Sequence, residues 1–399
     1  MGQTVPHLTL YALFYEQIQR KPPFYPIKWI TLQQFHPINW TKTTTNIAQT
    51  MNKQEIVISE NIQQEFNHAC AECKHDKTFV LTDETTQQLC LPVVANAECL
   101  ANATTITISA TDTHKTLESL ARVWKALSDG NATRHSLLVN LGGGMVTDLG
   151  GFAASTFKRG ISFINIPTTL LAMVDASVGG KTGINFNGLK NEIGTFNNAN
   201  TVLLDTQFLN TLDRENILSG YAEMLKHGLI NNVEMWAELM NFDIDSPDLK
   251  ALNRMVADSV KVKERIVEQD PTETGIRKAL NLGHTAGHAF ESLALRRTPI
   301  LHGYAVAYGL VVELYLSCVK MHFPTGKMRQ TVQFIKEHYG KMAISCDDYP
   351  QLIEYMTHDK KNVSGTINFT LLQDIGDICI NRSATKDEIC EALDFYREC

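Results

Sequence analysis

Short apolar runs alternate with amphipathic stretches between Met51 and about Thr211, and this alternation limits the possible folds more than any other feature of the chain. The runs typical of strands are 55–59, 78–82, 104–109, 136–141, 162–166 and 201–205, and the helical stretches between them include 61–73, 115–128 and 146–155. Strands and helices in alternation predict a mostly parallel sheet with helices on both faces. We therefore expect an α/β, Rossmann-like domain over residues 51–211.

Strand signals almost vanish after Leu212. Apolar residues recur at helical spacing over 213–229, 247–269, 279–295, 305–322 and 325–339, with prolines as stops near several ends. Two short extended runs, 366–372 and 377–380, precede a final helix from Lys386. Residues 212–399 should form a mainly α-helical domain. An active site would then lie in a cleft between the two domains, near the carboxyl ends of the strands.

The first fifty residues differ from the rest, because they hold five of the twelve prolines and show neither a helical nor an alternating period. We expect residues 1–50 to be a disordered leader, or to precede a true start at Met51.

The composition is that of an ordinary soluble globular protein, with 44% hydrophobic and 20% charged residues. A net charge of −7 argues against a nucleic-acid partner, and no apolar run is long enough for a membrane span. Nine cysteines without a disulfide-like spacing favour a reducing cytoplasm. One cluster, 68–75, carries two histidines and two cysteines, but a single Cys-x-x-Cys pair on a polar helix seldom supplies a zinc site, so we favour a structural role.

A glycine turn follows the predicted strand at 136–141. Gly142, Gly143 and Gly144 precede a helix expected near Met145, so backbone amides at the helix start could receive a pyrophosphate. The Gly-x-Gly-x-x-Gly spacing is only partly met, and a packing turn stays open as an alternative. Asp83 and Asp112, each after a strand, could accept ribose hydroxyls, although either could be a turn residue or a helix cap.

Residues 167–191 are rich in glycine and polar side chains. Two lysines and an asparagine near a glycine loop suit a phosphate or a carboxylate, and a solvated loop is the alternative. The polar side chains concerned are Thr168, Thr169, Asp175, Lys181, Lys190 and Asn191.

His284 and His288 lie four residues apart in a helical stretch, so their imidazoles should share one face. With Glu223 or His302 as a third ligand they would form a catalytic metal site, for which zinc fits best and cobalt or iron is acceptable. A chance pair stays open, because the chain has thirteen histidines.

Five stretches closely resemble the 3-dehydroquinate synthase family: GGGMVTDLGGF at 142–152, IPTTLLAMVDASVGGKTG at 166–183, GYAEMLKHG at 220–228, LNLGHTAGH at 280–288 and DKKN at 359–362. The resemblance runs from about Met51 to the C-terminus. It implies a single-function, bacterial-type enzyme that converts 3-deoxy-D-arabino-heptulosonate 7-phosphate to 3-dehydroquinate and phosphate in the shikimate pathway.

The resemblance also implies which residues hold the cofactors. A metal, normally zinc, would be bound by Glu223, His284 and His302, whereas His288 would serve the reaction. The positions implied for NAD are Asp83, Asp112, Lys115, Gly143, Gly144, Val146, Asp148, Thr168, Thr169, Lys181, Lys190, Phe208 and Thr211. Asp112 stands where many relatives have glutamate, so its hold on the ribose could differ.

Several of the residues implied to contact the substrate are cations, which would lie together in one cleft of an otherwise acidic protein. They are Arg159, Asp175, Lys181, Asn191, Lys226, Lys263, Arg277, Asn281, His288 and Lys360, with Lys361 as an alternative to the last. Arg159 is expected to reach the phosphate pocket of a partner subunit, which implies a homodimer.

The implied reaction begins with hydride transfer to NAD+, continues with loss of phosphate and return of the hydride, and ends with an aldol closure. His288 is the expected proton shuttle, because an imidazole titrates near neutral pH. Three alternatives stay open: a related cyclase for a neutral sugar phosphate, a metal-dependent polyol dehydrogenase and an inactive scaffold.

Overall fold

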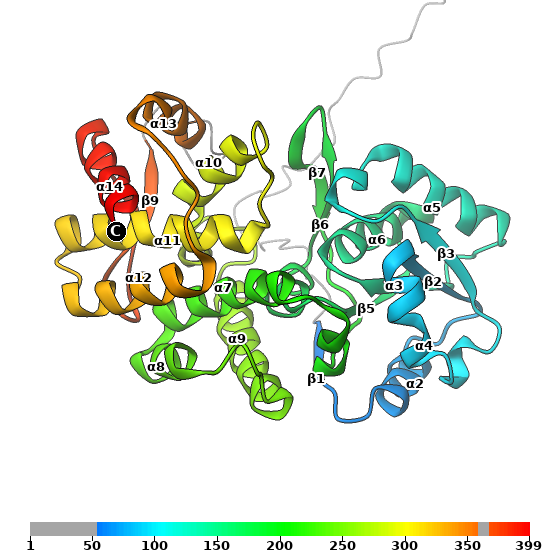
Figure 1. The fold of residues 1–399 in the computed structure, drawn as a ribbon. Coiled ribbons are helices and arrows are strands. Elements are labelled where there is room, and N and C mark those ends of the chain that lie inside the picture. The colour runs from blue at the N-terminus through cyan, green and yellow to red at the C-terminus, as the bar shows by residue number, and fades with distance from the viewer. Residues whose placement is uncertain (1–53, 358–366) are drawn as a thin grey trace, which may run out of the picture. The chain divides into compact units, whose positions relative to one another are not determined.

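The computed structural model describes residues 54–357 and 367–399. A sheet of six parallel strands lies in the first half of this region, in the order β1-β8-β5-β4-β2-β3 (Figure 1). The strands are β1 (Glu55–Ile58), β2 (Thr78–Asp83), β3 (Thr104–Ile108), β4 (Leu137–Gly142), β5 (Ser162–Pro167) and β8 (Thr201–Leu204). All six were predicted from their apolar runs, and the parallel order confirms the α/β class.

Helices connect these strands. They are α2 (Ile62–Glu72), α3 (Glu84–Leu89), α4 (Leu91–Val94), α5 (Leu117–Asp129) and α6 (Gly144–Thr156), with short 3-10 turns η1 (Glu98–Leu100), η2 (Asp112–His114) and η3 (Phe157–Arg159). Every residue of β2 and β4 is buried, as expected of parallel strands covered on both faces. Asn61 and Thr116 cap α2 and α5 through their side chains, which fixes where those helices begin.

The polar stretch at 167–191 contains an element that the sequence analysis missed. After a π-helical turn, η4 (Ala172–Ala176), the chain forms an antiparallel hairpin of β6 (Lys181–Phe186) and β7 (Leu189–Phe196). Asn187 and Gly188 make its two-residue turn with positive φ angles of 50° and 77°. An Asn-Gly pair is a strong hairpin signal. The sequence did not reveal this hairpin because β7 is almost entirely exposed and lacks an apolar alternation, and β6 is only partly buried.

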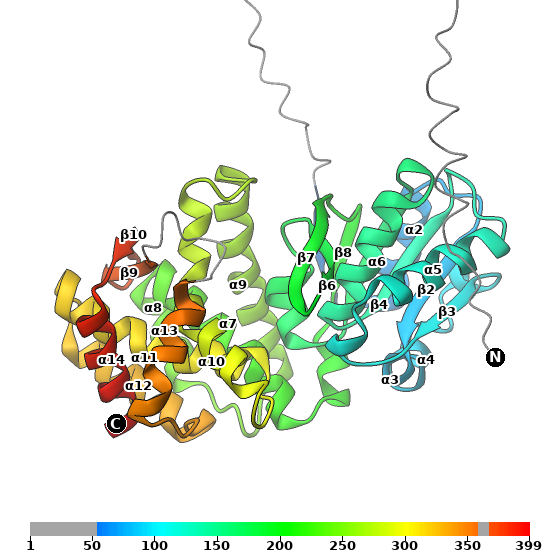
Figure 2. The ribbon, with the colours of Figure 1, turned by 90° about the horizontal axis from the view of Figure 1, so that it is seen from above.

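The second half of the described chain is mainly helical, as predicted. Its elements are η5 (Thr206–Thr211), α7 (Arg214–Asn231), α8 (Val233–Asn241), α9 (Leu249–Gln269), η6 (Ile276–Asn281), α10 (His284–Ala294), α11 (His302–Met321), α12 (Thr325–Tyr339), η7 (Cys346–Asp348), α13 (Tyr349–Thr357), β9 (Asn368–Asp374), β10 (Asp377–Ser383) and α14 (Lys386–Glu398). The helices and the small β9–β10 sheet are seen from a second direction in Figure 2.

One helix boundary was predicted wrongly. The expected helix over 279–295 is divided, because Gly283 has a left-handed φ of 80° between η6 and the start of α10 at His284.

Within residues 54–357 and 367–399, one helix is long and apolar enough to cross a membrane by composition alone. It is α11, and 67% of its apolar window is buried inside the protein, so its hydrophobicity serves the core.

Two predictions fall outside the described residues: the leader over 1–50 and the choice between Lys360 and Lys361.

The cluster of histidines and cysteines at 68–75 lies within the described residues. Both ring nitrogens of His75 lie within hydrogen-bonding distance, one of the Cys70 carbonyl and one of the Thr78 hydroxyl. The groups of possible metal ligands among the described residues do not include this cluster.

Candidate active site

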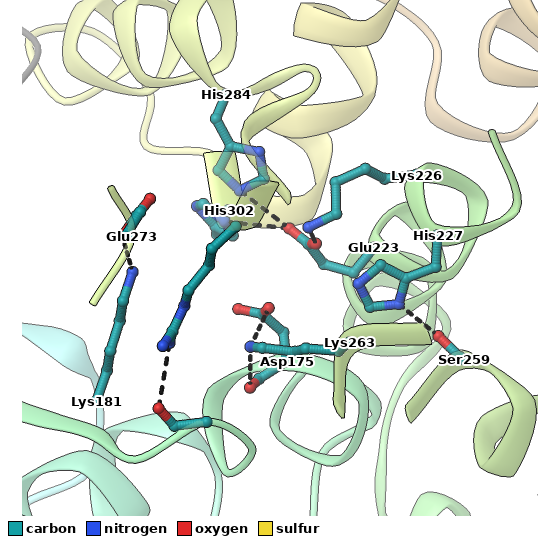
Figure 3. A network of polar contacts seen from close by, with 12 residues as sticks. Asp175, Lys181, Glu223, Lys226, His227, Ser259, Lys263, Glu273, His284 and His302 are labelled. Carbon is teal, nitrogen blue, oxygen red and sulfur yellow. Dashed lines mark hydrogen bonds and ion pairs between the residues drawn. The ribbon is translucent and has the colours of Figure 1, made fainter. Parts of the chain in front are cut away.

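Three potential metal ligands from three different helices converge at one point. Glu223 lies inside α7, His284 begins α10 and His302 begins α11. Nε2 of His284 lies 3.3 Å and Nε2 of His302 lies 3.5 Å from Oε1 of Glu223. Figure 3 shows the three side chains pointing toward one another. The structure therefore brings together the ligand set that the family resemblance implied. The His284 and His288 rings are also close, with centroids 5.4 Å apart, but the two residues do not share a possible ligand group among the described residues.

The donor chemistry of this group fits a divalent ion. Oε1 of Glu223 is fully buried and accepts no hydrogen bond with acceptable geometry from the described residues. A buried, unpartnered carboxylate oxygen facing two imidazole nitrogens is unfavourable unless a cation satisfies it. Two nitrogens and one oxygen also match the three-ligand set of catalytic zinc sites.

The second oxygen of Glu223 has a different partner. It accepts a short hydrogen bond from Lys226, one turn further along α7, and both side chains are buried. Burial alone would raise the pKa of Glu223, but the Lys226 ammonium outweighs it and holds that pKa well below the usual range. Burial and Lys226 together lower the pKa of His284 to about 4, so its imidazole is neutral at pH 7 and able to bind a metal.

A second ion pair lies beside the first. Lys263 on α9 donates to Oδ1 of Asp175 in η4, at 2.5 Å, and to the carbonyl oxygen of the same residue. Burial lowers the pKa of Lys263, although Asp175 opposes the change. Arg277 is 2% exposed, and its guanidinium donates to the carbonyl oxygens of Pro271 and Gly179. It forms no ion pair with a carboxylate of the described residues, so its charge is available to an anion.

Glu273 was not singled out from the sequence, yet it contacts two predicted substrate residues. Its carboxylate accepts hydrogen bonds from Lys181 at the start of β6 and from Asn281 in η6. Burial would raise its pKa, but Lys181 lowers it. Lys181 and Asn281 are therefore brought together across a separation of a hundred residues in sequence, as their predicted common role requires.

The glycine turn forms the amino end of α6. Gly143 is the N-cap and provides no side-chain cap, so the first amides of the helix are open to an anion. A Cβ on Gly143 would come within 3.1 Å of Thr169, and one on Gly144 within 3.1 Å of Ala176. Val146 is different, because its side chain is buried and its amide donates to the Gly143 carbonyl. Its predicted contact with NAD therefore rests on its position in the turn.

Lys115 joins two more predicted residues. It donates at 2.5 Å to Asp148 on α6 and at 2.5 Å to Asn191 on β7. Burial raises the pKa of Asp148 in spite of Lys115. Asn191, predicted to contact substrate, thus lies beside residues predicted to contact NAD.

The remaining residues that were predicted to bind NAD lie in turns and helix ends, where most of them form hydrogen bonds with nearby residues. Asp83 caps α3 by accepting from the Thr86 amide at 2.8 Å, which is the alternative left open for it. Oγ1 of Thr169 accepts from the Ala172 amide, and Phe208 and Thr211 lie in η5. Thr168 is buried and its amide donates to Gly142.

Two further predicted residues, Lys190 and His288, lie at the edge of the site, whereas Arg159 does not contact it. Lys190 on β7 lies 2.7 Å from Glu291 and 3.4 Å from Asp112. His288 lies on α10 and forms a possible ligand group with Glu291 and His302. Arg159 is exposed at the end of η3 with a positive φ of 72°, so the structure does not bring it to the other predicted substrate residues.

Two buried groups had no signal in the sequence. Nδ1 of His227 lies 2.7 Å from the Ser259 hydroxyl, and burial followed by Lys226 lowers its pKa to about 3. Glu313 on α11 accepts from the amides of Gly283 and Ala286, and so caps the helix that carries His284.

Comparisons with known proteins agree with this arrangement. The family models of the N-terminal and C-terminal parts of 3-dehydroquinate synthase match residues 105–219 and 220–362. A 3-dehydroquinate synthase of Parabacteroides distasonis is 57% identical over 349 residues, which cover 87% of this chain and 99% of that protein. One from Oceanobacillus iheyensis is 38% identical over 81% of this chain and 90% of its own length.

Solved structures show the same fold at low identity. A 2-deoxy-scyllo-inosose synthase complexed with carbaglucose-6-phosphate, NAD+ and Co2+ matches with a TM-score of 0.74 and 20% identity, over 86% of this chain and 96% of its own. A 2-epi-5-epi-valiolone synthase from Streptomyces hygroscopicus with NAD+ and Zn2+ matches with a TM-score of 0.74 and 24% identity, over 87% and 97%. Since the family models together span more than half of the sequence and a 57% identical relative is covered almost completely, the chain belongs to the 3-dehydroquinate synthase family.

Proposed function

We propose that this chain is a working 3-dehydroquinate synthase, which converts 3-deoxy-D-arabino-heptulosonate 7-phosphate to 3-dehydroquinate and phosphate with NAD and a divalent metal ion. The observation that carries the proposal is the convergence of Glu223, His284 and His302 beside Lys226 of the helical half, with Lys190 of the sheet half paired to Glu291 next to His302. An inactive scaffold would have no reason to keep two buried ligands, one half-buried ligand and several desolvated cations together.

The cofactors supply the two chemical steps that protein side chains perform poorly. NAD at the glycine turn of α6 supplies a reversible hydride transfer, and a divalent ion on the three ligands supplies polarisation of substrate hydroxyl oxygens. Zinc suits the ligand set best, with cobalt as an acceptable substitute.

The substrate carries a carboxylate and a phosphate, and the site offers matching cations. Lys263 and Arg277 are buried, so their electrostatic attraction for an anion is screened less than it would be at the surface. Lys181 and Asn281 already contact one carboxylate, that of Glu273, so a substrate anion binding there has to exchange these bonds. This set of groups holds the substrate in a fixed position relative to the hydride acceptor.

In this proposal His288 transfers protons, and Lys226 keeps a metal ligand ionised. His288 moves a proton between an imidazole nitrogen and the substrate during loss of phosphate. Lys226 keeps its proton at Nζ and donates a hydrogen bond to Glu223, which stabilises the anionic form of that ligand.

The finer assignments belong to the same proposal. Asp83, Asp112, Lys115 and Lys190 would bind NAD, and residues 51–211 and 212–399 would act as separate nucleotide and metal domains. Arg159 would complete the phosphate pocket of a second copy of the chain, and its exposure at the end of η3 supports this. All nine cysteines are free, which agrees with a reducing cytoplasm.

Phosphate release tests the proposal directly. The protein is incubated with NAD+, zinc and either the heptulosonate phosphate, sedoheptulose 7-phosphate or glucose 6-phosphate, and inorganic phosphate and NADH are measured. We expect phosphate from the heptulosonate alone and no accumulation of NADH, because the hydride returns to the product. Phosphate from a neutral sugar alone would indicate a related cyclase, and NADH stoichiometric with product would indicate a dehydrogenase.

A further inference from the structure

We propose that Glu291 is a positioning residue that orients His302 for metal binding and ties this ligand to the β6–β7 hairpin through Lys190. Glu291 lies on α10 one turn after His288 and has no role in the metal set of Glu223, His284 and His302. The inference rests on the proposed function, because it concerns the metal and NAD that this function requires.

The first contact of Glu291 is with a metal ligand. Its Oε2 lies 3.5 Å from Nδ1 of His302, while Nε2 of the same ring lies 3.5 Å from Oε1 of Glu223. The two ring nitrogens of His302 thus face two different carboxylates. An acceptor at Nδ1 favours the tautomer with its proton there, so the lone pair at Nε2 points to the metal site.

The second contact of Glu291 is with the nucleotide half of the chain. Its Oε1 accepts from Nζ of Lys190 at 2.7 Å, and Lys190 also lies 3.4 Å from Asp112. Lys190 belongs to β7, whose hairpin also carries Lys181 and Asn191. One carboxylate therefore connects His302, the first residue of α11, with a strand that follows the glycine turn by about forty residues.

The burial of Glu291 makes these contacts hard to replace. The residue is 7% exposed, so its charge depends on Lys190 and His302 for compensation. A carboxylate with one oxygen on each partner can fix the orientation of both, whereas an exposed ion pair would be exchanged freely with water.

The first test measures metal affinity in the whole protein. Glu291→Gln keeps the shape of the side chain and removes its charge, and we expect zinc affinity, measured by competition with a chromophoric chelator, to fall about tenfold to hundredfold. Glu354→Gln, the same change at an exposed position on α13, is the matched control and should leave zinc affinity unchanged. Glu291→Asp keeps the charge but shortens the side chain, and should also weaken zinc binding. A folded Gln or Asp variant with wild-type zinc affinity overturns the proposal.

The second test isolates the Lys190 contact. Lys190→Gln should lower NAD affinity, measured by quenching of intrinsic fluorescence, and leave zinc affinity within about twofold, because Glu291 still faces His302. Glu291→Gln should lower NAD affinity too, but not further in a chain that already carries Lys190→Gln. Additive losses in the double variant would show that Glu291 does not act through Lys190.

The two proposals fail in different ways. Wild-type protein that binds no zinc would contradict the proposed function itself. Wild-type protein that binds zinc, with variants that bind it equally well, would contradict only this inference.

Discussion

His284 and His288 are one helical turn apart on α10, yet they have different surroundings. His284 faces Glu223 and lies against the Leu282 carbonyl, whereas His288 groups with Glu291 and His302. We expect His284→Ala to lose the metal and nearly all turnover. His288→Ala should keep the metal and lower turnover by about 10²–10⁴-fold. Metal content per chain and phosphate release distinguish the two, and an equal loss of metal in both variants would mean that the roles are assigned wrongly.

His302 should make metal binding depend on pH. Burial alone would lower its pKa, but the neighbouring carboxylates of Glu223 and Glu291 raise it to about 10. The metal-free imidazole is therefore protonated at about pH 8, and a histidine that binds a metal must lose that proton. Because the raised pKa favours the cation at every lower pH, zinc affinity should increase as the pH rises toward about 10.

Calorimetry measures this proton directly. Titrating zinc into metal-free protein at about pH 8, in buffers of different ionisation enthalpy, should show release of about one proton per chain. Binding without proton release would show either that His302 is not a ligand or that it is neutral beforehand.

Individual residues of the site were only partly predictable. The spacing of His284 and His288 favours a pair, with Glu223 or His302 as a third ligand. Only the family resemblance removed His288 from this set and kept both of the others. Glu273 and Glu291 were missed because an isolated glutamate carries no local signal. Their partners Lys181 and Lys190 lie 92 and 101 residues away, so the contacts exist only in the fold.

At the scale of elements, the start of α10 sets the position of His284. Gly283 turns the chain with its left-handed φ, and the buried carboxylate of Glu313 on α11 accepts the amides that follow. The neighbouring helix packs unusually close at this point. A Cβ on Gly309 of α11 would lie 1.9 Å from the carbonyl oxygen of Gly283.

This close approach predicts a large effect for a small substitution. Gly309→Ala should force α11 away from the start of α10 and lower the free energy of unfolding by about 3 kcal/mol. Gly326→Ala on α12 is the control, because no atom lies within 4 Å of its Cβ and alanine is the better helix former. Thermal melting with and without zinc compares the two variants. Equal melting temperatures would show that the packing between α10 and α11 tolerates a methyl group.

Elements were predictable where burial imposes a pattern. The six parallel strands and the long helices have apolar residues at the spacing that their buried faces require. The β6–β7 hairpin has no such face, and its one local signal was Asn187 with Gly188. Short helices such as α8 and α13 were missed because nine residues give too few turns to establish a period.

At the scale of the whole described chain, three ion pairs join the sheet half to the helical half. They are Lys181 with Glu273, Lys263 with Asp175, and Lys190 with Glu291. Each pair includes a residue predicted to bind substrate or NAD. The same contacts that hold the halves together therefore build the site, which explains why no single segment of the sequence contains it.

The central claim is that bound NAD and a metal ion on Glu223, His284 and His302 act at one site to oxidise and then restore the same substrate carbon. The direct measurement is phosphate release from the heptulosonate phosphate by protein stripped of both cofactors with a chelator and charcoal. We predict no activity in the stripped protein or with either cofactor alone, and recovery when both are added, with NAD+ far below the amount of product. Full activity in the stripped protein would contradict the account.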